Sequence, residues 1–196
     1  MSQPDLSPPY SSTADLYEDV ERNLRIVLAA HAAEGIVSSC RPGCDACCHQ
    51  LVMSTQAEAD ATAKFVAGLP AAESGELKAR LAAWADRTRS WRRRLQDGAD
   101  GDVEALVETL AAEYWAERVP CPFLVDRRCA VYPARPLACR HHFAVSDPAE
   151  CERGDAERIL RIEALDDAFF LAQDAIPEDQ AEIGFFPELV TLSLAD

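Results

Sequence analysis

Apolar side chains recur at three- and four-residue steps through most of the first half of the chain, a spacing typical of amphipathic helices. The first series follows Ser12 and Thr13, either of which can cap the start of a helix, and it stops near Gly35, a residue type that favours helix ends. Its members are Leu16, Val20, Leu24, Val27 and Leu28. We therefore predict a helix that ends just before a group of closely spaced cysteines.

Further helices are predicted from residue 55 onward. Thr55 and Glu58 have the spacing of a capping box, which opens a helix that ends at Gly68. Pro70 begins a long helix with one narrow apolar seam, made of Leu77, Leu81, Trp84, Thr88, Trp91 and Leu95. After a predicted turn at residues 97–102, another amphipathic helix carries Val103, Leu106, Val107, Leu110 and Tyr114.

The pattern changes between residues 120 and 140, where helical periodicity stops. Four prolines punctuate this stretch, and two short β-branched or aromatic runs flank residues 126–128, which predicts a small hairpin or an irregular loop. The remaining expected elements are a helical turn at 137–143, a short helix with Asp147 as its cap, a longer helix at about 156–174 and a last short helix at 187–192.

These elements together predict a mainly α fold. We expect a small helical domain that surrounds an irregular cysteine-rich metal centre with a short β-hairpin. Residues 1–11 are rich in proline and serine and predict a disordered tail, so residues 12–196 form the single domain.

Charge narrows the range of partners. The chain has 19 basic and 34 acidic residues and a formal net charge of −15, which argues against nucleic acid and anionic membranes as partners.

No apolar run approaches the roughly 20 residues that span a bilayer, and the N-terminus has no secretory signal pattern. We therefore expect a cytoplasmic protein. In that reducing compartment clustered cysteines indicate a metal site or catalysis in preference to disulfides. A protein partner is left open.

The eight cysteines are the candidate metal ligands of the chain. Four of them fall within nine residues, and Cys44 and Cys47 form a C-x2-C chelate loop that lets two sulfurs reach one ion. Three more are spread over the proline-rich stretch, and one follows it. The predicted ligands are Cys40, Cys44, Cys47, Cys48, Cys121, Cys129, Cys139 and Cys151.

The adjacent pair Cys47 and Cys48 leaves the number of metal centres open. Side chains of neighbouring residues diverge, so the two thiols serve two centres, or one of them is a spare thiol. Eight thiols would complete two tetrahedral four-sulfur sites, or would hold one cluster with the others free. We expect sulfurs of both blocks to share a centre, because the proline-rich stretch has little apolar periodicity to order it alone.

Basic side chains beside the cysteines have two interpretations. They offset the negative charge of metal-bound thiolates, or they are surface arginines. These residues are Arg41, Arg127, Arg128, Arg135 and Arg140. His49, His141 and His142 also neighbour cysteines and could replace one in a mixed site, although we expect them to support the ligands or face solvent. His31 is expected to be an ordinary helix residue.

The two cysteine blocks resemble the CxxCxxCC family of zinc- or iron-chelating domains. The matching features are Cys40, Cys44, Cys47, Cys48, Glu58, Cys121, Cys129, Tyr132, Arg135, Pro136, Cys139 and Arg140. The resemblance covers roughly residues 38–152, with three residues between Cys40 and Cys44 where the family name has two. It implies metal chelation, and some relatives resemble flagellin lysine methylases that carry an iron–sulfur centre.

Two functions follow from these observations. The first is a metal-binding protein that holds zinc or an iron–sulfur cluster, with a preference for iron–sulfur. The second is an iron–sulfur-dependent enzyme for methyl transfer or redox chemistry, against which stands the absence of any G-x-G loop among the eight glycines. A locally basic stretch within residues 78–94 would suit an interaction surface, but a solvated helix face is its expected role.

Overall fold

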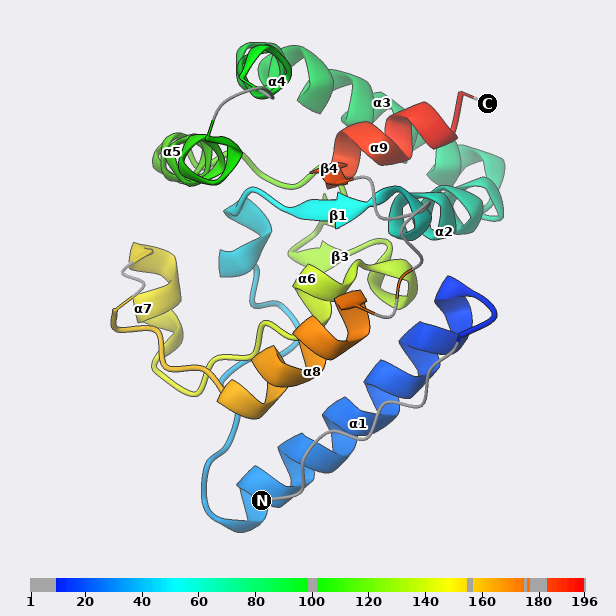
Figure 1. Ribbon diagram of the computed structural model, residues 1–196. Coiled ribbons are helices and arrows are strands. Elements are labelled where there is room, and N and C mark those ends of the chain that lie inside the picture. Colours follow the sequence, from blue (N-terminus) through cyan, green and yellow to red (C-terminus); the bar gives the residue numbers. More distant parts are fainter. Residues whose placement is uncertain (1–9, 99–101, 155–156, 175, 177–182, 196) are drawn as a thin grey trace.

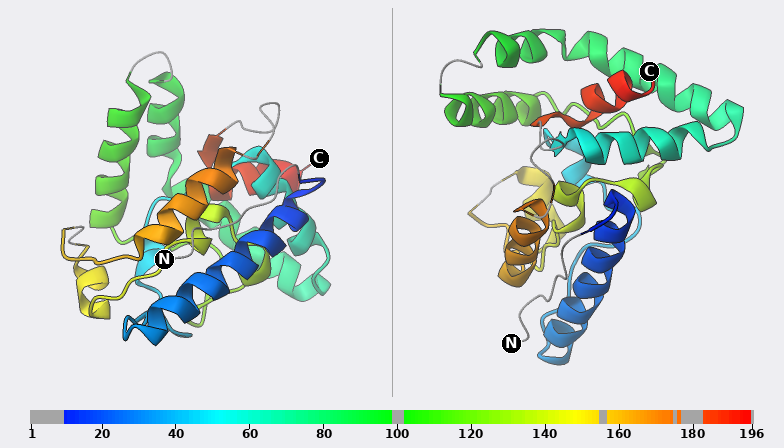
Figure 2. Two further views of the ribbon diagram at one scale, coloured as in Figure 1. Left: turned by 60° about the horizontal axis from the view of Figure 1, so that its bottom comes forward. Right: turned by 45° about the vertical axis from the view of Figure 1, so that its right-hand side comes forward.

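Helices make up most of the computed structural model, which describes residues 10–98, 102–154, 157–174, 176 and 183–195. One layer holds α2 (Gln56–Ala67), α3 (Ala71–Arg87), α4 (Arg89–Asp97), α5 (Val103–Ala116) and α9 (Phe186–Ser193). The other holds α1 (Thr13–Ala33), α7 (Pro148–Arg153) and α8 (Glu163–Asp174). Figures 1 and 2 show the short α6 (Leu137–Arg140) and two small sheets between these layers. The predicted mainly α class is confirmed.

The first helix begins and ends where the sequence predicts. The Ser12 side chain accepts a hydrogen bond from the backbone N–H of Asp15, and Gly35 follows the helix with a φ of +84°. Residues 1–9 of the predicted tail lie outside the described residues. Tyr10 at its end donates a hydrogen bond to Asp19 Oδ2 at 2.6 Å.

The predicted long helix from Pro70 to Leu95 is interrupted at Thr88, where α3 ends and α4 begins. The Thr88 hydroxyl donates a hydrogen bond to the Trp84 carbonyl at 2.8 Å, a contact that bends helices. The apolar seam nevertheless continues across the break, since Trp84, Thr88 and Trp91 are all buried. Part of the predicted turn that follows, residues 99–101, lies outside the described residues.

The predicted hairpin forms from β2 (Leu124–Val125) and β3 (Arg128–Cys129). Its two central residues, Asp126 and Arg127, have φ angles of +46° and +60°. Positive φ at both positions is the turn geometry that matches the twist of two-residue hairpins.

The predicted helix at 156–174 begins too early, because residues 157–162 are not helical and α8 begins at Glu163; residue 156 lies outside the described residues. Arg161 instead forms an antiparallel bridge with Ala144, and the Val145 N–H donates to the Leu160 carbonyl at 2.8 Å. Residues 160–161 therefore form backbone contacts with residues 144–145 in place of the hydrogen bonds of a helix.

A second sheet was not predicted. It pairs β1 (Met53–Thr55) antiparallel with β4 (Ile183–Phe185), and β4 leads directly into α9. The pairing joins segments far apart in the sequence and sets α9 against α2.

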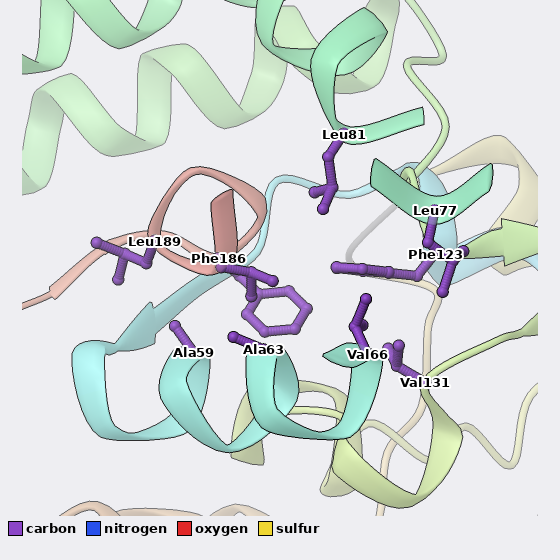
Figure 3. Packing of buried hydrophobic residues seen from close by; sticks show 10 residues of the cluster. Ala59, Ala63, Val66, Leu77, Leu81, Phe123, Val131, Phe186 and Leu189 are labelled. Atoms are coloured by element: carbon purple, nitrogen blue, oxygen red, sulfur yellow. The ribbon is translucent and has the colours of Figure 1, made fainter. Parts of the chain in front are cut away.

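The main core lies between α2, α3, α9 and the proline-rich segment. Figure 3 shows side chains of these segments pointing toward one another around Phe186 and Phe123. The two rings are tilted, with centroids 5.4 Å apart. Cys121 and Cys129 pack against this cluster, so the same core that joins the helices also fixes part of the second cysteine block.

Two surface features bear on the expected partners. No helix in the described part of the chain is long and apolar enough to cross a membrane. In the basic stretch, Arg89, Arg92 and Arg94 form ion pairs with carboxylates of Asp86, Glu188 and Glu113. The Arg89 pair is exposed, as on a solvated helix face, whereas Arg92 and Arg94 join α4 to α9 and α5.

Candidate metal centre

The first cysteine block is a tight loop followed by a single helical turn. Gly43 has a φ of +91°, a conformation that glycine adopts without strain, and the Cys44 N–H donates to the Arg41 carbonyl at 2.9 Å. The 3-10 turn η1 (Ala46–His49) then presents Cys47 and Cys48 from adjacent positions.

The second block is joined to the first by direct contacts. The Cys121 N–H donates a hydrogen bond to the Cys48 carbonyl at 2.7 Å. Arg127, in the hairpin turn, donates to Asp45 Oδ1 at 3.1 Å. Cys129 lies on β3, and α6 carries Cys139. Two segments more than 70 residues apart in the sequence therefore meet at their cysteines.

Four thiols lie near Cys47, and together with it we call them the inner thiols: Cys47, Cys48, Cys121, Cys129 and Cys139. Burial raises the pKa of Cys121 to about 12 and the pKa of Cys139 well above its ordinary value. In both cases the negative charge of neighbouring inner thiolates raises the pKa further. These sulfurs are close enough to oppose one another's ionisation.

The adjacent pair Cys47 and Cys48 is coupled electrostatically. The neighbouring Cys48 side chain lowers the pKa of Cys47 to about 7, and Cys47 in turn raises the pKa of Cys48. That the two thiols serve two centres, or that one of them is a spare thiol, stays a prediction.

Cys40, Cys44 and Cys151 form a second group, the outer thiols. α7, which carries Cys151, packs against η1. Burial raises the pKa of Cys151, and the charges of Cys40, Cys44 and Cys47 raise it further. The Ala144 N–H donates to the Cys40 sulfur at 3.4 Å. Cys47 is thus the inner thiol whose charge also acts on the outer thiols.

All eight cysteines are free thiols and half-buried. Within the described ranges, no three histidine, cysteine or acidic side chains lie together in an arrangement that could hold a metal ion as they stand. The fold therefore gathers the sulfurs around Cys47 without setting them in a coordination geometry.

Two of the five flanking arginines are buried beside the inner thiols. Arg135 and Arg140 both donate to Glu21 Oε1, at 3.1 and 2.5 Å, and Arg140 also donates to the Pro133 carbonyl at 2.6 Å. Their positive charges lower the pKa of Cys129, although burial raises it more. The sequence did not predict a role for Glu21, because no motif or spacing distinguishes it from the other acidic residues of α1.

The other three arginines, Arg41, Arg127 and Arg128, are exposed. Arg135 and Arg140 therefore fit the role of offsetting thiolate charge. Arg41, Arg127 and Arg128 fit the interpretation as surface arginines.

Glu58 connects the capping box to the second block. Its carboxylate accepts hydrogen bonds from the Thr55 N–H at 3.0 Å and from the Leu137 N–H at 2.6 Å. The predicted capping box is thereby confirmed, and the same side chain holds the first residue of α6. Glu58 acts on the site by positioning the helix that carries Cys139.

The four histidines contact other parts of the chain, and none is hydrogen-bonded to a cysteine side chain in the described residues. His49 Nδ1 is 3.2 Å from the Asp45 carbonyl oxygen, and His31 Nδ1 is 2.9 Å from the Val27 carbonyl oxygen within its helix. His141 stacks on Phe169 with a centroid distance of 4.2 Å. Burial lowers the pKa of His142 to about 4, so the ring is neutral at pH 7.

Comparison with known proteins gives one match. No curated protein and no solved structure matches the chain, so the expected likeness to flagellin lysine methylases stays a prediction. The CxxCxxCC family, described as "Putative zinc- or iron-chelating domain", matches residues 39–164, which is more than half of the chain and includes every cysteine. This protein therefore belongs to the CxxCxxCC family of zinc- or iron-chelating domains.

Proposed function

We propose that this protein binds zinc or iron through a thiolate centre to which both cysteine blocks contribute. The observation that supports this most directly is the contact between the blocks, where the Cys121 N–H donates to the Cys48 carbonyl at 2.7 Å and Arg127 donates to Asp45 at 3.1 Å. The inner thiols form the proposed primary centre, and the outer thiols extend it. The proposed ligand set is Cys40, Cys44, Cys47, Cys48, Cys121, Cys129, Cys139 and Cys151, within the single domain of residues 12–196.

The chemistry of the donor set fits a soft metal. Several buried thiols that raise one another's pKa do not ionise together unless a cation balances their charge, and a bound metal ion supplies that charge. A four-thiolate site on a divalent ion keeps a net negative charge, which Arg135 and Arg140 are placed to offset. Thiolate ligands also require reducing conditions, in keeping with the predicted cytoplasmic location.

Zinc and an iron–sulfur cluster both suit cysteine ligands, and we retain the preference for iron–sulfur as a prediction. Anaerobic purification of the full chain, followed by an absorption spectrum and elemental analysis, separates them. An iron–sulfur centre gives brown protein with broad visible absorption and acid-labile sulfide. Colourless protein with stoichiometric zinc would reject the iron–sulfur assignment and keep the metal site.

Three cysteine variants test which thiols are ligands. We expect Cys47→Ser to lose most of the bound metal, measured by mass spectrometry on protein whose folding is checked by circular dichroism. Cys151→Ser probes the outer thiols: about half the metal remains if there are two centres, and all of it remains if the inner thiols form one. Stoichiometric metal in both Cys47→Ser and Cys139→Ser would contradict the shared centre.

A further inference from the structure

A cavity of about 530 Å³ lies between β1, α6 and α8. Its walls come from Gln50 through Ser54, from α6 and the two histidines after it, and from Phe169 and Gln173 of α8. None of the eight cysteines is among its lining residues, so it is distinct from the metal centre. The two are neighbours, because the segments that carry Cys48 and Cys139 continue into the cavity wall. A volume of this size suits a small molecule.

The cavity wall holds one arginine and one carboxylate, Arg161 and Glu58. Arg161 lines it, while Asp166, whose carboxylate lies 3.4 Å from the guanidinium, does not. Glu58 also lines it, but its two oxygens already accept hydrogen bonds from Thr55 and Leu137. The Arg161 guanidinium has five N–H donors, so its ion pair with Asp166 leaves donors for a ligand, whereas both Glu58 oxygens already have partners.

Three polar side chains in the cavity wall have donors or acceptors that no other side chain or backbone group of the described residues engages. Gln50, His142 and Gln173 are half-buried, and their side chains make no hydrogen bond to any other part of the chain that the structure describes. Half-buried amides and imidazoles usually find partners in a folded protein. Placed around one cavity, these groups can donate hydrogen bonds to the same ligand.

About half of the lining side chains are apolar. Phe169 presents an aromatic ring that stacks with His141, and the other apolar residues are Leu51, Val52, Met53, Leu137, Ala138, Ile159 and Ile183. Ser54 and His141 add two further polar side chains. An apolar body would pack against the apolar side chains, while its charged end meets Arg161. Apolar walls combined with converging polar groups are typical of small-molecule sites.

We propose that this cavity binds a small organic acid, with its carboxylate at Arg161 and His142 and its apolar or aromatic body against Phe169 and Leu137. Binding does not depend on the metal, so this proposal stands or fails separately from the proposed function.

The test uses the full, metal-loaded chain and two probes of the same shape, 3-phenylpropanoate and its neutral amide, 3-phenylpropanamide. Calorimetric titration should detect the acid in the roughly millimolar range or tighter and the amide about tenfold more weakly, because a charge-assisted contact is lost. Arg161→Gln should weaken the acid about tenfold and leave the amide unchanged. Arg158→Gln, an exposed arginine outside the cavity, is the matched control and should bind both probes as wild type does.

Three results would overturn the proposal: no binding of the acid at millimolar concentration, equal binding of acid and amide, or equal effects of Arg161→Gln and Arg158→Gln. Circular dichroism melts of both variants exclude loss of folding as the cause, and Arg161 is exposed enough for its replacement to be tolerated. Metal content measured on the same samples shows whether the metal centre is intact.

Discussion

At the scale of single residues, a few buried polar side chains position the cysteine centre. Glu58 is only 4% exposed, and its oxygens accept hydrogen bonds from Thr55 and Leu137 and lie 3.4 Å from the Tyr17 hydroxyl. Arg140 is 2% exposed, stacks over the Tyr17 ring at 3.9 Å and pairs with Glu21. These contacts tie α1, α2 and α6 together next to Cys139. The sequence marks Glu58 by its capping-box spacing and gives no comparable signal for Glu21.

We expect Glu58→Ala to reduce the free energy of unfolding by about 3 kcal/mol, because it leaves the buried N–H groups of Thr55 and Leu137 without acceptors. Urea denaturation followed by circular dichroism measures the loss. Glu73→Ala is the control: this exposed carboxylate in the first turn of α3 should contribute only about 0.5 kcal/mol. A similar small loss for Glu58→Ala would contradict the bridging role.

At the scale of elements, local signals predict most helix ends, and long-range contacts explain the exceptions. Ser12, Thr55 and Asp147 each cap a helix through a side-chain hydrogen bond, as their spacing predicts. The early start predicted for α8 is wrong because residues 160–161 pair with residues 144–145 across the chain. Periodicity within a segment carries no information about such a partner.

The end of α7 offers a matched pair of glycine variants. Gly154 has a φ of +72°, and a Cβ at this position would overlap the Trp115 ring. Gly154→Ala should therefore lower the free energy of unfolding by about 3 kcal/mol, from backbone strain and displacement of the ring. Gly75 lies inside α3 with open space around it, so Gly75→Ala should stabilise the protein by about 0.7 kcal/mol. Thermal unfolding should shift in opposite directions for the two; shifts of the same sign would show that Trp115 does not constrain α7.

At the scale of the whole molecule, the cysteine segments lie between two helical layers (Figure 2). The layer of α3, α4 and α5 has its own apolar cluster, made of Trp84, Trp91, Leu110, Tyr114, Val119 and Phe185. The proline-rich segment has fewer apolar anchors, chiefly Phe123, Val131 and Leu137, and these are divided between two clusters. A bound metal should therefore matter far more to the order of the cysteine segments than to the helices of this layer.

Removal of the metal tests this difference. We expect chelation to increase amide hydrogen exchange in residues 40–49 and 121–140 by tenfold or more, because metal binding and local folding share free energy. Residues 103–116 of α5 should keep their protection and serve as the internal control. Exchange that rises equally throughout the chain, or stays unchanged in both cysteine blocks, would show that the metal does not order them.

The sequence by itself determined the helical class, most helix caps, the hairpin and the membership of the cysteine-chelating family. These properties depend on neighbours within a few residues or on the spacing of cysteines, both of which are written directly in the chain. Only the tertiary structure decided the β1–β4 pairing, the placement of Glu21 beside Arg135 and Arg140, and the cavity at Arg161. It also decided how the thiols divide into inner and outer groups. Each of these brings together residues far apart in sequence, and no local periodicity specifies which distant side chains will meet when the layers pack.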